Sequence, residues 1–90
     1  MKNSVDELLH DKLDETDYTE LVYLTNKYHC DGAFYFGCDP MGLSYGLFWA
    51  GVLAGSASAK LEMHDYDLCV KAQCVISEEL REMLHSYYSM

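Results

Sequence analysis

Basic residues are scarce in this sequence. Its 90 residues include six Lys and Arg against fifteen Asp and Glu, which gives a formal net charge of −9 at pH 7. A charge of this size repels DNA, RNA and anionic lipid through its long-range field, so we expect no direct nucleic-acid binding and no membrane binding. A partner with a basic surface, on a protein or a nucleoprotein complex, is expected instead.

The motifs of common catalytic and nucleotide-binding sites are also lacking. There is no Gly-Lys-Ser/Thr phosphate loop and no Gly-x-Gly-x-x-Gly after a predicted strand. Cys30 and Cys38 are separated by seven residues and Cys69 and Cys74 by four. Neither pair has the tight knuckle spacing of a structural zinc site, and on a strand Cys69 and Cys74 would point to opposite faces. We predict a non-enzymatic protein with no catalytic residue, metal or cofactor.

The N-terminus lacks the charged segment, apolar core and cleavage site of a secretory signal. With four cysteines and no export signal, we expect reduced thiols and a cytoplasmic location, unless the chain is the mature form of a secreted protein.

Charged residues and histidine are absent from residues 40–59. Asp39 and Pro40 predict a helix start, because Asp caps free N–H groups and Pro at the first position has no N–H to leave unpaired. The helix should run to about Ser58. Small residues at a spacing of four would form one stripe that lets a second element approach closely: Gly42, Gly46, Ala50, Ala54 and Ser58. Tyr45, Phe48, Trp49, Val52 and Leu53 would cover the other side, which predicts a helix buried all round.

Two alternatives remain for this segment. Asp39-Pro40-Met41-Gly42 also fits a β-turn, and each internal Gly costs a helix about 1 kcal/mol relative to Ala, so strands over residues 43–54 are the alternative. A membrane span is disfavoured because Gly, Ser and Ala dilute the apolar run and neither flank carries a Lys/Arg cluster.

The flanking segments predict further elements. Ser4 and Glu7 form a capping box for a helix that breaks near Asp14, and a second helix should start at Thr16 or Asp17. Residues 33–36 have strand character, and apolar side chains alternate over residues 66–76, which predicts a strand paired with residues 60–64. Ser77 should cap the last helix, with Glu78, Glu79 and Glu82 near its start. We therefore predict one α+β domain over residues 1–90, with two N-terminal helices, a short antiparallel sheet, a buried central apolar helix and a C-terminal amphipathic helix.

Carboxylates gather near the N-terminus. Most charge runs are solvated faces, but this one also has the composition of a surface that binds a Lys/Arg-rich groove, with a tyrosine as anchor. The candidate partner-binding residues are Asp6, Glu7, Asp11, Asp14, Glu15, Asp17, Tyr18 and Glu20.

In size, acidity and its carboxylate-rich run from Asp6 to Glu20, the chain resembles small phage-encoded inhibitors of host defence, such as anti-CRISPR proteins and DNA mimics. The resemblance implies an inhibitor that binds a nucleic-acid-binding effector complex and blocks its basic DNA or RNA site. The alternative is a module that self-associates, as a homodimer, through the small-residue stripe from Gly42 to Ala54.

Overall fold

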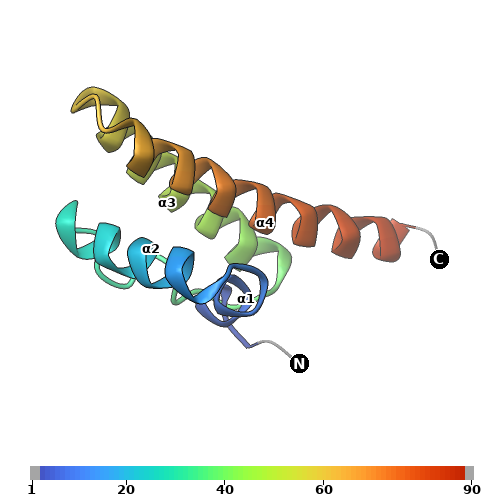
Figure 1. Cartoon of the computed structure of the whole chain (residues 1–90). Helices are drawn as coiled ribbons and strands as arrows, with labels where there is room; N and C mark the ends of the chain where they lie inside the picture. The colour runs from blue at the N-terminus through green and yellow to red at the C-terminus, as the bar shows by residue number, and fades with distance from the viewer. Residues whose placement is uncertain (1–2, 89–90) are drawn as a thin grey trace.

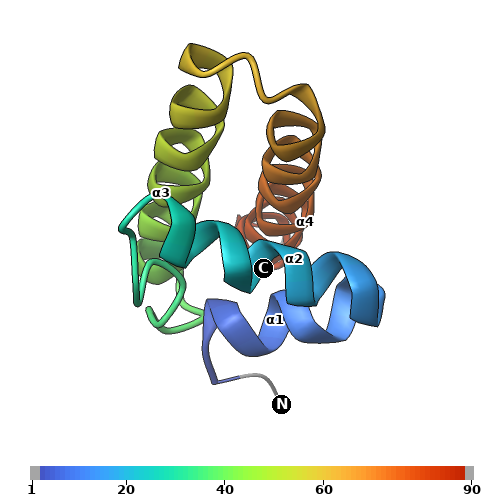
Figure 2. The same cartoon turned by 60° about the vertical axis from the view of Figure 1, so that its left-hand side comes forward.

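The computed structural model describes residues 3–88, which form four α-helices and no β-strand (Figure 1). The helices are α1 (Val5–Lys12), α2 (Glu15–Lys27), α3 (Pro40–Ala59) and α4 (Met63–Tyr88). α3 and α4 form an antiparallel hairpin, and α1 and α2 lie across one side of it (Figure 2). The predicted α+β fold is therefore wrong, and the two segments assigned to a sheet have other structures.

The start of α1 has the predicted cap. The Ser4 hydroxyl accepts from the Glu7 backbone N–H at 3.2 Å, and a Glu7 carboxylate oxygen accepts from the N–H of Asn3 at 3.1 Å, one residue before the expected donor. The N–H groups of Val5 and Asp6 donate to carbonyls in the loop between α2 and α3. The free N–H groups of the first turn therefore all have partners, and the loop is held against α1.

That loop contains the first segment predicted as a strand, residues 33–36. The carbonyls of Phe34 and Phe36 each accept from α1 at 2.8 Å. The N–H groups of Ala33 and Tyr35 donate to the carbonyls of Cys30 and Gly32, as in turns, and the only sheet-like pairing in the described residues is an isolated bridge between Ser4 and Gly37. Residues 33–36 therefore form turns and a bend, and the carbonyls of Phe34 and Phe36 bond to the N-terminus of α1 and not to a neighbouring strand.

α2 begins at Glu15, slightly earlier than predicted. The Asp14 carboxylate accepts from the Asp17 backbone N–H at 2.7 Å, so Asp14 is the cap and Asp17 lies in the first turn. The chain then turns through Gly32, whose φ of 79° is in the left-handed region that glycine accepts without strain.

The uncharged segment forms helix α3, so the prediction of a helix with an Asp39 cap is confirmed and the strand alternative is wrong. The Asp39 carboxylate accepts from the Gly42 N–H at 2.6 Å, and Pro40 occupies the first turn. The helix ends at Ala59, one residue beyond the predicted end. Within residues 3–88, no helix has the length and apolar character to cross a membrane.

The small residues of α3 make its close contacts. A Cβ atom on Gly42 would lie 1.8 Å from the carbonyl oxygen of Gly37, and one on Gly46 would lie 3.1 Å from Val5 and 3.5 Å from Ile76. The backbones of α3 and its neighbours thus approach more closely than larger side chains permit. The buried members of the predicted stripe are Gly42, Gly46, Ala50 and Ala54, whereas Ser58 is exposed.

The opposite side of α3 is only partly buried, contrary to prediction. Of the residues predicted to cover it, Leu53 is buried and Trp49 and Val52 are half-buried. Met41 is 69% exposed, Phe48 61% and Tyr45 49%. α1, α4 and the loop before α3 all pack on the small-residue side, and the described chain places no further helix over the aromatic side (Figure 2).

The second segment predicted as strand, residues 60–76, mostly forms the first half of α4. Its buried residues are Leu68, Cys69, Ala72 and Ile76, which is helical spacing. Leu68, Ala72 and Ile76 satisfy a spacing of four as well as alternation, so the pattern was ambiguous and the period of two was the wrong choice. Ser77 consequently lies inside the helix and does not cap it.

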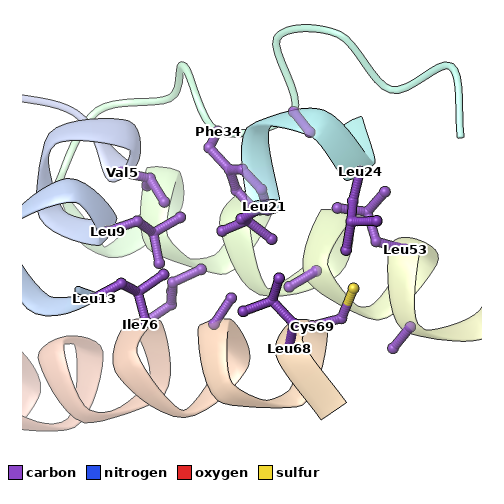
Figure 3. Close-up of a cluster of buried hydrophobic side chains, with 14 of the residues drawn as sticks. Val5, Leu9, Leu13, Leu21, Leu24, Phe34, Leu53, Leu68, Cys69 and Ile76 are labelled. Carbon is purple, nitrogen blue, oxygen red and sulfur yellow. The ribbon is translucent and has the colours of Figure 1, made fainter. Parts of the chain in front are cut away.

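The core forms between α3, α4 and the two N-terminal helices. Figure 3 shows Leu68, Cys69 and Ile76 pointing from α4 toward side chains of α1 and α2, including Leu13 and Leu21. No polar or charged side chain in the described chain is buried, so this core is held by apolar packing.

Two glycines of α3 provide a test of the close packing. Gly42→Ala should lower the free energy of unfolding by about 2–3 kcal/mol, because its Cβ would overlap the backbone of Gly37. Gly55 has no atom within 4 Å of an added Cβ, so Gly55→Ala should raise the same quantity by roughly 0.5–1 kcal/mol. Urea unfolding followed by circular dichroism measures both, and equal effects of the two variants would contradict the packing described.

Candidate binding surfaces

The predicted partner-binding residues lie on α1, on α2 and at the turn between them, and several are already engaged within the chain. Tyr18 is half-buried, donates its hydroxyl proton to the Asp6 carboxylate at 2.9 and 3.1 Å, and stacks on His10 with ring centroids 4.3 Å apart. Burial, followed by the bond to Asp6, raises the pKa of Tyr18 to about 12. Tyr18 thus joins α1 to α2.

Other predicted residues tie α2 to α4 or complete its cap. Asp17 pairs with Lys71, Glu20 lies 2.9 Å from His64, and Asp14 is the cap of α2. Glu15 is more loosely placed, with a carboxylate oxygen 3.6 Å from His10 and both side chains largely exposed. Glu7 and Asp11 are exposed on α1.

A third polar link between α2 and α4 was not predicted. Lys27 and Tyr28 donate to the same Asp65 carboxylate oxygen at 2.8 and 3.0 Å. The bond from Lys27 is the main reason that the pKa of Asp65 is below its usual value. Polar contacts from Lys27, Asp17 and Glu20 therefore fasten α2 along α4.

The fold brings two acidic segments together that are far apart in the sequence. An open hollow of about 200 Å³ lies where the end of α1 meets α4, lined by Lys12, Val75, Glu78, Glu79 and Glu82. One helical turn earlier on α4, Lys71 pairs with Asp17, and the charge of Asp14 acts on Lys71 as well. We call this surface the acidic edge, and its carboxylates are Asp14, Asp17, Glu78, Glu79 and Glu82.

Only the first part of the acidic edge was among the predicted site residues. No ion pair within residues 3–88 engages Glu78, Glu79 or Glu82. The sequence analysis placed these glutamates near the start of a helix, where the helix dipole favours negatively charged side chains. Since α4 instead begins at Met63, they lie in its middle and the dipole does not account for them.

A second surface, which the sequence predicted to be buried, is the exposed side of α3. Phe36 stacks on Tyr45 with centroids 5.1 Å apart, and Phe48 meets Trp49 edge to face at 5.5 Å. These residues and Met41 border an open, almost wholly apolar hollow of about 480 Å³. We call Met41, Tyr45, Phe48 and Val52 the aromatic stripe of α3.

The cysteines and histidines are dispersed. Across residues 3–88, no group of three or more His, Cys, Asp or Glu side chains is placed to hold a metal ion. Cys69 is buried in the core, and burial raises the pKa of its thiol to about 11, whereas Cys74 is exposed on the same helix.

Comparisons with protein-family models, with curated proteins and with solved structures find no match to this chain. The fold and surfaces define a small four-helix protein with one acidic edge and one exposed aromatic helix face.

The pair between His64 and Glu20 predicts a pH-dependent contribution to stability. The hydrogen bond to Glu20 raises the pKa of His64 above its usual 6.5. The stabilisation is therefore fully present below about pH 6.5 and is lost as the pH rises through the raised pKa. The melting temperature of His64→Gln should fall below that of the parent at about pH 6 and approach it above about pH 8.

His85→Gln is the matched control, since His85 is an exposed histidine of α4 that makes no ion pair within the described residues. A deficit in His64→Gln that stays constant from pH 6 to pH 8 would show that the ion pair does not contribute.

Proposed function

We propose that this chain is a non-enzymatic acidic protein that binds the basic nucleic-acid site of a protein or nucleoprotein complex and inhibits it. The observation that carries the proposal is the acidic edge, where carboxylates of the turn before α2 meet those of α4 beside Lys12. Glu78, Glu79 and Glu82 line one hollow, and three carboxylates around a hollow suit a lysine or arginine side chain.

Within the acidic edge, the three glutamates of α4 support this proposal better than the seven carboxylates near the N-terminus do, and those seven include Asp14 and Asp17 of the edge itself. Asp6 and Asp14 accept hydrogen bonds from other groups of the chain, which occupy part of their carboxylates. Asp17 and Glu20 are paired with Lys71 and His64. Glu78, Glu79 and Glu82 have no such ion pairs within residues 3–88, and the rigid helix α4 holds them at fixed spacing. Fixed, unneutralised carboxylates are what substitution for phosphate groups requires.

The sequence also predicted self-association through the small-residue stripe. Other segments of the same chain lie against this stripe. Gly42 lies against Gly37, and Gly46 lies against Val5 and Ile76 of the same chain. These contacts within the chain favour the acidic edge over the small-residue stripe as the binding surface.

The proposed inhibition can be tested with a purified DNA-targeting nucleoprotein complex that has a basic DNA groove. The chain should weaken DNA binding by the complex, and the effect should fall as salt rises from about 50 to 300 mM because salt screens the charges. The triple variant Glu78→Gln, Glu79→Gln, Glu82→Gln should inhibit at least roughly tenfold less strongly. Fluorescence anisotropy of a labelled duplex measures this.

A matched triple variant separates the acidic edge from net charge. Asp31→Asn, Glu62→Gln and Asp67→Asn remove the same three charges at exposed positions outside the edge. This control should inhibit as the parent does. Equal loss in both triple variants would assign the effect to net charge alone, and no inhibition at low salt would rule out this class of partner.

A further inference from the structure

The aromatic stripe of α3 lies directly opposite the side that the chain itself buries. Successive helix residues are about 100° apart, so Met41, Tyr45, Phe48 and Val52 form one line of roughly 17 Å along the helix. Pro40–Ala59 contains no charged residue, so the line and both of its margins on α3 are uncharged. Met41, Tyr45 and Phe48 are exposed and Val52 is half-buried, and an uncharged apolar line of this kind on a strongly acidic protein indicates an interface.

A second apolar surface lies near the same end of α3. Pro40, which precedes Met41, borders an open hollow with Leu84, Tyr87 and Tyr88 of α4. The last turns of α4 extend past the start of α3 (Figure 1), and Tyr87 and Tyr88 are 71% and 79% exposed. Since large aromatic side chains carry roughly 150–250 Å² each, the two surfaces leave on the order of 700 Å² of side chain open. A standard interface buries about 800 Å² on each partner.

We propose that the aromatic stripe is a dimer interface, occupied by the same stripe of a second copy of this chain. In a twofold antiparallel pair, Met41 and Tyr45 of one copy would face Val52 and Phe48 of the other, so one stripe supplies both halves of the contact. The projecting end of α4 adds Leu84, Tyr87 and Tyr88 to each side. The open area matches the need of such a dimer.

The charges favour a second copy over a basic partner at this surface. A basic partner would gain nothing from a helix face that carries no carboxylate, whereas two acidic chains can meet there without burying a charge. The net charge of −9 on each copy still repels at long range, so salt should strengthen the dimer. This is the reverse of the salt dependence expected for inhibition through the acidic edge, and the two proposals can therefore fail separately.

The test uses two readouts on the full chain over roughly 1 µM to 1 mM protein. Sedimentation equilibrium should show a monomer passing to a dimer, more readily at high salt. Trp49 is the only tryptophan and touches Phe48, so its emission should shift to the blue over the same concentrations. Phe48→Gln should raise the dimer dissociation constant about 30-fold, as removal of a central aromatic anchor does.

Tyr23→Gln is the matched control, because Tyr23 is 64% exposed on α2, away from the stripe, and its variant should dimerise as the parent does. Far-ultraviolet circular dichroism verifies that both variants keep their helices. A monomer at every concentration, or a dimer that Phe48→Gln leaves unchanged, would overturn the proposal. So would a monomer whose Trp49 emission shifts only with phosphatidylcholine vesicles, since lipid would then be the occupant.

Discussion

The close approach of other segments to the small-residue side of α3 is the contact on which the rest of the structure depends. Gly42 meets the backbone of Gly37, and Gly46 meets both Val5 and Ile76, so the loop, α1 and α4 all pack on one strip of one helix. This close approach lets the buried leucines and isoleucine of α1, α2 and α4 pack densely against α3. It also means that everything available for burying α3 is on one side, which leaves the aromatic side uncovered.

Polar contacts complete the arrangement at its edges, because the core itself is apolar. The loop carbonyls of Phe34 and Phe36 close the N-terminus of α1, and the contacts of Asp17, Glu20 and Lys27 bind α2 to α4. A protein this acidic has few cations, and the structure uses Lys27 and Lys71 at the boundary between α2 and α4. Carboxylates farther along α4 are left without such partners and give the acidic edge its charge.

The two proposed surfaces depend on different physical forces. The acidic edge acts through charge, at long range and weakly in salt, whereas the aromatic stripe acts through burial of apolar area. A dimer through α3 would leave both acidic edges on its outside, since α1 packs on the buried side of α3, away from the stripe. Two such edges on one particle would bind a repeated basic surface with higher avidity than one.

Local chemistry made the starts of α1 and α3 predictable, because a capping side chain acts within three residues of itself, whereas the starts of α2 and α4 were predicted wrongly. Ser4 and Asp39 were found in this way, and the uncharged helix followed from Asp39-Pro40. The strands were predicted wrongly because the spacing of apolar residues does not reveal which segment they pack against. Leu68, Ala72 and Ile76 fit a strand or a helix, and the aromatic residues 33–36 fit a sheet or a helix N-terminus.

The sequence by itself determined the charge, the caps of α1 and α3, and which residues of α3 are small enough for close contact. Only the tertiary structure decided which side of α3 is covered, and that Lys12 and Glu78 share one edge, because both depend on how segments distant in the sequence pack together. For that reason the candidate surfaces were only partly visible in the sequence. Packing decides which side chains lie within reach of a carboxylate. Packing also decides whether another helix covers Phe48.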